Sequence, residues 1–65
     1  MIKSRLKVVL AEENVSQQEL IKRMKYPVAN STMSNIVNGT IPKLDTAADI
    51  AQALGKRIEE VWIFE

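Results

Sequence analysis

Short, uncharged hydrogen-bonding side chains are concentrated in one stretch of this 65-residue chain, between Asn30 and Gly39. Serine, threonine and asparagine form helices poorly, so helix stability alone does not explain why they occur here. Their amide and hydroxyl groups donate and accept hydrogen bonds, which is the chemistry that distinguishes DNA bases at their major-groove edges. We therefore predict that residues 30–37 form a helix that lies in the major groove. Its outer side carries Asn30, Ser31, Ser34 and Asn35.

The opposite side of the same predicted helix is apolar. Met33, Ile36 and Val37 recur at helical spacing and are expected to pack against the rest of the protein. Asn38 and Gly39 follow, and glycine suits the left-handed conformation that ends many helices. The helix is therefore expected to present one side to a partner and the other to a core.

The composition excludes several classes of function. The chain has no histidine and no cysteine, so the commonest general base and the thiolate metal ligands are both absent. We expect no enzyme, no metal, no cofactor and no small-molecule ligand. No apolar run approaches the roughly 20 residues that span a bilayer, so we expect no membrane partner and a cytoplasmic, nucleoid-associated protein.

Charge is distributed unevenly along the chain, although its sum is only +1. Residues 1–43 carry seven Lys or Arg and three Glu (+7 − 3 = +4), whereas residues 44–65 carry two Lys or Arg and five Asp or Glu (+2 − 5 = −3). A basic end and an acidic end are expected, and a basic surface attracts nucleic acid. An ordinary mixed surface would also give some asymmetry by chance.

Helical patterns occupy most of the remaining chain. A first helix is predicted from Ile2 to Asn14, with a buried stripe of Ile2, Leu6, Val9 and Leu10. A second begins at Gln17, because Ser16 and Glu19 have the spacing of a capping box, and it ends before Pro27. Its inner side is formed by Leu20, Ile21 and Met24.

Two further helices are predicted after the polar stretch. One runs from about Leu44 to Leu54 before Gly55, and a short last one covers about Ile58 to Trp62. The inward side of the longer helix is expected to comprise Leu44, Ala47, Ala48, Ala51 and Leu54, and Ile41 before it is expected to fill the core. No strand pattern is present. The predicted fold is all-α, a compact bundle of five short helices in one domain covering residues 1–65.

Two short helices joined by a tight turn, the second polar on its outer side, form a helix-turn-helix pattern. Between about Leu6 and Trp62 the chain resembles the Cro/C1-type helix-turn-helix family of phage and bacterial repressors. The residues that carry the resemblance are Val15 to Leu20, Val28 to Gly39, Pro42, Asp49 to Gly55 and Ile58 to Val61. The resemblance implies a lambda-repressor-like DNA-binding fold and a sequence-specific regulator of transcription, a repressor of phage or mobile-element type. Its partner would be double-stranded DNA.

The resemblance also implies roles for individual residues. Positions that read base edges in the family are occupied here by Asn30, Ser31, Thr32, Ser34 and Asn35. Positions that contact the DNA backbone are occupied by Gln17, Gln18, Asn38, Thr40 and Lys43. For each of these polar residues, the alternative is an ordinary solvated side chain.

Three departures from the family pattern have structural consequences. Leu10 and Val37 replace a charged pair of the family, which predicts that the two apolar side chains touch. Tyr26 and Pro27 form a two-residue insertion in the turn, and Tyr26 is expected either to pack over the turn or to touch the DNA backbone. Ala29 replaces the usual Ser or Thr cap, so Asn30 is expected to be the N-cap itself.

The end of the chain is strongly apolar, with Val61, Trp62, Ile63 and Phe64 in succession. Val61 and Trp62 can complete the core while the last two cover its edge. Alternatively, Trp62, Ile63 and Phe64 form the interface of a homodimer that reads two half-sites about 34 Å apart. The competing function is a helix-turn-helix module that binds another regulator through this tail and does not bind DNA.

Overall fold

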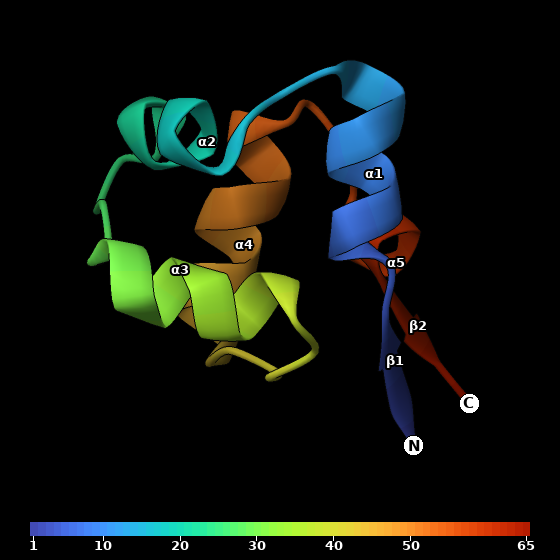
Figure 1. Cartoon of the computed structure of the whole chain (residues 1–65). Helices are drawn as coiled ribbons and strands as arrows, with labels where there is room; N and C mark the ends of the chain where they lie inside the picture. The colour runs from blue at the N-terminus through green and yellow to red at the C-terminus, as the bar shows by residue number, and fades with distance from the viewer.

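Five helices and one pair of short strands make up the protein, and a computed structural model describes all of residues 1–65. The elements in chain order are β1 (Ile2–Ser4), α1 (Leu6–Glu13), α2 (Gln17–Arg23), α3 (Asn30–Val37), α4 (Leu44–Ala53), α5 (Ile58–Val61) and β2 (Trp62–Phe64). In Figure 1, α2 and α3 lie on one side of the view, α1 and α5 on the other, and α4 between them. The predicted class of five short helices is confirmed, with the sheet as a small addition.

One apolar cluster holds the helices together. It consists of Leu6, Val9, Leu10, Val15, Leu20, Met24, Met33, Ile36, Ala47, Ile50, Ala51, Leu54, Val61 and Trp62, and no polar or charged residue is buried with them. All five helices contribute to this cluster. Because burial of apolar surface is the main favourable term in folding, the shared cluster fixes the positions of the helices relative to one another.

The beginning of the chain corrects a prediction. Ile2 was expected to open the first helix, but residues 2–4 form a strand that pairs antiparallel with β2, so that Ile2 lies opposite Phe64 and Ser4 opposite Trp62. The expectation that the chain has no strand was therefore wrong, and the last helix ends at Val61 because Trp62 already belongs to β2. A three-residue strand is too short to show an alternating pattern, and its partner is about 60 residues away in the sequence. The two termini consequently lie together at one end of the molecule (Figure 1).

The α4 region corrects a second prediction. Ile41 and Leu44 were expected in the core, but they are 42% and 74% exposed. Leu44 begins α4 and projects beyond the end of the core, whereas Ala47 and Ala51 on the following turns are buried. Ala48 is also exposed, because at about 100° per residue it lies well off the side defined by the buried positions.

None of the helices combines the length and the apolar character that crossing a membrane requires.

Candidate nucleic-acid interface

Helix α3 has one apolar and one polar side, as predicted. Met33 and Ile36 are buried, with 0% and 3% of their surface exposed, and Val37 packs against the same cluster. The buried side fixes the helix to the bundle. Contact between Leu10 and Val37 themselves stays a prediction, although Leu10 is buried in the cluster that Val37 joins.

The outer side of α3 is free of internal bonds. Asn30, Ser31, Thr32 and Asn35 are exposed, and Ser34 is half-buried. None of these five side chains makes a hydrogen bond within the chain. Exposed polar groups that have no partner in their own chain remain available to an external one.

The start of α3 differs from the prediction that Asn30 is its N-cap. The N-cap is Ala29, whose methyl group cannot accept a hydrogen bond, and Asn30 is the first residue of the helix. The side chain of Asn30 is therefore not folded onto its own helix as a cap. Its backbone carbonyl instead accepts a hydrogen bond from Gln17 Nε2 at 3.1 Å.

The bond from Gln17 joins the first residue of α2 to the first residue of α3. Helix α2 begins as predicted, because Ser16 Oγ accepts a hydrogen bond from the backbone N–H of Glu19 at 3.1 Å. Only this half of the capping box forms, since the Glu19 carboxylate pairs with Arg23 at 3.0 Å. Gln17 is half-buried, while the neighbouring Gln18 is exposed.

The end of α3 leads directly into the loop that holds the other predicted phosphate contacts. Gly39 has a φ of +122°, a conformation that other residues rarely adopt, and the N–H groups of Gly39 and Thr40 bond back to the last turn of α3 at 3.2 and 3.0 Å. Gly39 therefore ends the helix as predicted.

A shallow hollow beside α3 brings several predicted site residues together. Thr32 and Asn35 line it from α3, and Thr40 and Lys43 line it from the loop. Asn38 is exposed but does not line the hollow. Thr46, in the first turn of α4, also lines it and was missed from the sequence. Its position three residues after Lys43, at the start of a helix, is the signal that could have indicated it.

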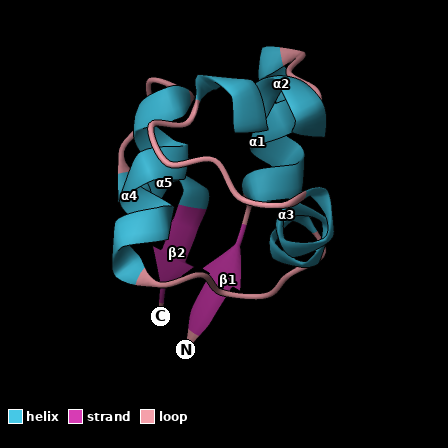
Figure 2. Cartoon of the chain, turned by 90° about the vertical axis from the view of Figure 1, so that its left-hand side faces the viewer, coloured by secondary structure: helices cyan, strands magenta, loops and turns pink.

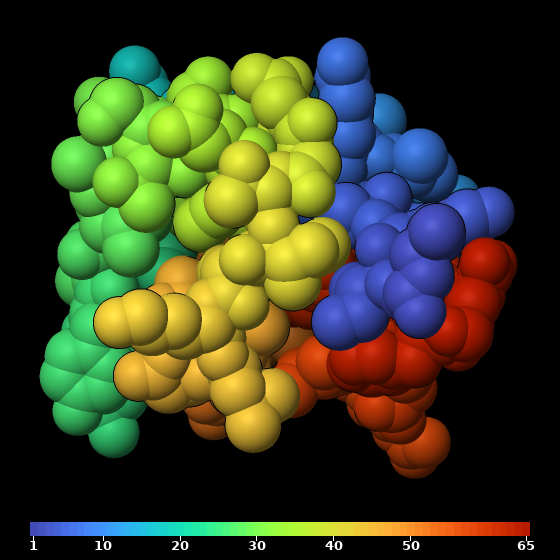
Figure 3. Space-filling view, turned by 90° about the horizontal axis from the view of Figure 1, so that it is seen from below, coloured from blue at the N-terminus to red at the C-terminus, as the bar shows by residue number.

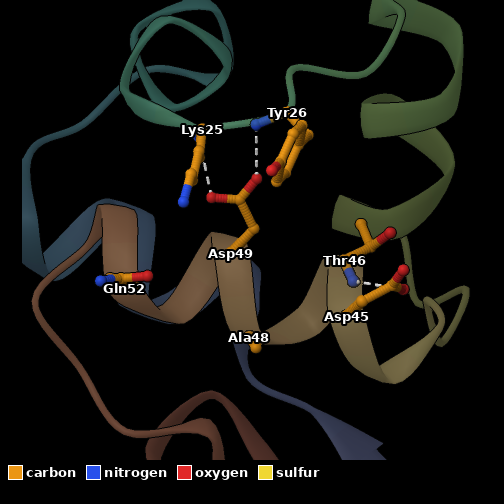
Figure 4. A pocket seen from close by; sticks show the side chains of 7 residues that line it. All are labelled: Lys25, Tyr26, Asp45, Thr46, Ala48, Asp49 and Gln52. Carbon is orange, nitrogen blue, oxygen red and sulfur yellow. Dashed lines mark hydrogen bonds between the residues drawn. The ribbon is translucent and has the colours of Figure 1, made fainter.

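The turn between α2 and α3 is not covered by its own tyrosine. Of the two alternatives for Tyr26, packing over the turn is not supported, because Tyr26 is 72% exposed. The turn is instead bonded to α4, because Asp49 Oδ1 accepts the N–H of Lys25 at 2.9 Å and Oδ2 accepts the N–H of Tyr26 at 2.8 Å (Figure 4). The sequence did not indicate this role of Asp49, since the partners are 23 and 24 residues apart.

The arrangement of a capped α2, a turn and an α3 with a free polar side is that of a helix-turn-helix. Residues 5–65 match the family model of the Cro/C1-type HTH DNA-binding domain. The chain belongs to this family. The match covers nearly the whole chain and confirms the resemblance inferred from the sequence. No curated protein matches the chain.

The apolar tail of this Cro/C1-type domain is divided between its core and its surface. Trp62 is 2% exposed and belongs to the core of its own chain, so it offers almost no surface to a second copy. Ile63 is half-buried and Phe64 is 59% exposed. The expectation that Val61 and Trp62 complete the core is therefore confirmed.

Phe64 belongs to an exposed apolar surface that the sequence did not predict. It lines a hollow with Ile2, Ile41 and Leu44, and these four side chains are between 40% and 74% exposed. We call these four residues the apolar patch. The loop between α3 and α4 passes close to the two strands (Figure 2), and the loop, the N-terminal strand and the C-terminal strand meet on one face (Figure 3). The patch thus unites segments from the beginning, the middle and the end of the chain.

Proposed function

We propose that this Cro/C1-type domain is a sequence-specific regulator of transcription, a repressor, that places α3 in the major groove of double-stranded DNA. The observation that carries the proposal is the outer side of α3, where short amide and hydroxyl groups are exposed and unbonded within the chain. An asparagine such as Asn35 can accept a hydrogen bond from the N6 amino group of adenine and donate one to its N7, while Ser31 and Ser34 can bond to any base. Thr32 can offer its hydroxyl to a phosphate or its methyl group to thymine.

The phosphate contacts in this proposal come from the flanks of α3. Gln17 and Gln18 lie at the start of α2, where free N–H groups and the helix dipole favour phosphate oxygens. Asn38, Thr40 and Lys43 lie in the loop after α3. Lys43 is the only cation among the ten proposed DNA contacts, so base readout is assigned to α3 and electrostatic attraction to its neighbours.

A homodimer is the second part of the proposal. The apolar patch supplies a surface whose burial against a second copy removes four large apolar side chains from water. Its Ile41 lies next to Thr40, so a contact there would lie beside the loop that carries proposed phosphate contacts in each copy. Each copy measures 30 × 22 × 18 Å, which is compatible with two recognition helices one turn of DNA, about 34 Å, apart. We propose that Phe64 and Ile63 take part in this contact and that Trp62 supports them from the core.

The apolar patch also supports an alternative function. A module that binds another regulator through the patch, without binding DNA, would need the same exposed apolar side chains. The low net charge of +1 and the absence of Lys or Arg from α3 favour this alternative.

A salt titration of binding to mixed-sequence DNA separates the two functions. A regulator that grips several phosphates loses affinity steeply as salt rises, because counterions are released on binding. No binding even at low salt would support the interaction module instead. Selection of preferred sites from a random DNA pool then tests sequence specificity, and a palindromic site would report the dimer.

Size-exclusion chromatography with light scattering tests the homodimer directly. The expected result is a mass twice that of the chain, reached well below a concentration of hundreds of micromolar. A monomer at that concentration would contradict the homodimer and leave DNA binding as a separate question.

A further inference from the structure

The turn between α2 and α3 contains two successive backbone donors without a backbone acceptor. Helix α2 ends at Arg23, and the N–H of Met24 still bonds to Ile21 at 3.2 Å. The next two N–H groups, of Lys25 and Tyr26, have no such partner, and Pro27 has no N–H at all. The backbone of the turn therefore cannot hold its own conformation through helical bonds.

Apolar packing does not hold the tip of the turn either. Lys25, Tyr26 and Pro27 are all exposed, and the side chains of Met24 and Val28 on either side are the ones that reach the core cluster. The ammonium group of Lys25 lies 5.7 Å from the centre of the Tyr26 ring, and the two residues border an open hollow on α4 without entering the core. The tip needs another attachment.

Asp49 supplies that attachment with both oxygens of one carboxylate. One oxygen accepts the N–H of Lys25 and the other accepts the N–H of Tyr26, at 2.9 and 2.8 Å. Hydrogen bonds to an ionised acceptor are shorter and stronger than neutral ones. A side-chain amide has a single acceptor oxygen, whereas a carboxylate has two. Only a carboxylate can therefore accept one hydrogen bond on each of two oxygens.

Asp49 has a fixed position because the helix that carries it, α4, is packed into the core. The next residues, Ile50 and Ala51, are 0% and 2% exposed and belong to the core cluster. The carboxylate thus connects the tip of the turn to the core, and Pro27, with its restricted φ, follows directly on the way into α3. At the start of α3, the bond from Gln17 to Asn30 makes a second connection, to α2.

We infer that Asp49 is a positioning residue for DNA recognition. Its carboxylate sets the course of the lengthened turn, and thereby the angle at which α3 presents its outer side to the bases. Asp49 does not touch DNA in this role. The inference rests on the proposed function for its consequence in specificity, but the effect on α3 is a property of the free protein.

The test compares Asp49→Ala and Asp49→Asn with Asp45→Asn. Asp45 lies one turn earlier on α4, and its carboxylate bonds only to the N–H of the next residue, Thr46, at 2.8 Å. Asp49→Asn and Asp45→Asn remove the same charge from the same helix. Circular dichroism identifies the variants that are fully folded. Asp49→Asn keeps one acceptor oxygen and replaces Asp49→Ala in the comparison if Asp49→Ala does not fold.

Two measurements on the free protein come first. Amide hydrogen exchange at Lys25 and Tyr26 should be slow in the wild type and in Asp45→Asn, and faster in the Asp49 variants. Residual dipolar couplings should show that α3 changes its angle to α4, or becomes less ordered, only in the Asp49 variants. An α3 with unchanged angle and order would overturn the inference, whatever the protein does with DNA.

The measurement with DNA uses the site selected from a random pool and mixed-sequence DNA as probes. In Asp49→Ala, the ratio of the two affinities should fall about tenfold, the size of one lost base contact. In Asp45→Asn the ratio should not change. An unchanged ratio in a folded Asp49 variant would overturn the inference but not the proposed function. A wild-type protein that binds both DNAs equally well would overturn the proposed function. In that case the residual dipolar couplings of the free protein still test the role of Asp49.

Discussion

The outer side of α3 and the apolar patch are neighbouring surfaces of opposite chemistry. One consists of short amide and hydroxyl groups, whereas the other consists of Ile2, Ile41, Leu44 and Phe64. The loop between α3 and α4 belongs to both, because Thr40 and Lys43 border the hollow beside α3, and Ile41 borders both that hollow and the one at the apolar patch.

This difference bears on the proposed function, because the two surfaces suit two different kinds of partner. The polar groups are not bonded within the chain, which suits hydrogen bonding to base edges, and the apolar groups are not covered, which suits contact with another protein. Each surface therefore has groups that no other part of the chain bonds or covers. Substitutions that affect one surface should therefore leave the other intact, and the following predictions test that separation.

The largest effect is expected where α3 is attached to the bundle. Leu10→Arg places a charge at a position that is only 7% exposed and should destabilise the fold by about 3–5 kcal/mol. Adding Val37→Glu should recover much of this loss if the two side chains touch. Chemical denaturation of the two single variants and the double variant measures the coupling. Val8→Arg on the same helix, at a residue that is 47% exposed, is the control and should have little effect. Strict additivity of Leu10→Arg and Val37→Glu would contradict the contact.

An effect of similar size, but on the proposed dimer, is expected from Leu44→Glu in the apolar patch. Each copy would lose roughly 1.5–3 kcal/mol of apolar burial, so the dimer should weaken by about 3 kcal/mol or more. The fold should remain intact, because Leu44 is 74% exposed. Sedimentation equilibrium measures the dimer constant, with Val8→Glu as an exposed apolar control outside the patch. Equal dimer constants for both variants would show that the patch is not the interface.

Asn35→Ala should act on the polar surface alone. Loss of one base contact should reduce the preference for the selected site by about 1–3 kcal/mol, with no change in the dimer constant. Competition binding against sites altered one base pair at a time measures the preference. Gln52→Ala removes an exposed amide from α4 that is not among the proposed DNA contacts, and should leave the preference unchanged. If Asn35→Ala weakened binding to all sequences equally, the base-reading role would be wrong.

The smallest effect is expected from Lys43→Gln. Binding should weaken alike for all sequences, and the slope of log affinity against log salt should fall by about 1 per subunit, because one phosphate contact is lost. Lys56→Gln is the matched control, since Lys56 follows the far end of α4 and pairs there with Glu13 at 3.6 Å. A change of sequence preference in Lys43→Gln would assign it to base readout instead.

Local signals predicted much of the helical part of this protein. The bounds of α3, the start of α2 at its Ser16 cap, and the end of α3 at Gly39 all agree with the structure. Caps and terminal glycines act within one turn of the chain, so the information lies in adjacent residues. The two sides of α3 were predicted for the same reason, because its buried residues recur within two turns.

The candidate site was predicted less completely than the helix that carries it. The outer residues of α3 lie where the pattern placed them. The predictions that Asn30 is the N-cap and that Tyr26 packs over the turn were wrong. Both errors concern how the chain enters α3. That course depends on Gln17 and Asp49, which lie 13 residues from Asn30 and 23 residues from Tyr26 in the sequence, and no local pattern records such bonds.

The sequence by itself determined the helix-turn-helix, the family and the polar character of the outer side of α3, because each depends on residue types at short, regular spacing. Only the tertiary structure decided that residues 2–4 pair with the tail, that Leu44 is exposed, and that Asp49 holds the turn. These features depend on which segments meet once the core has formed. Two segments can meet although they lie at opposite ends of the chain, as β1 and β2 do. Residue spacing along the sequence does not show which distant segments come together in space.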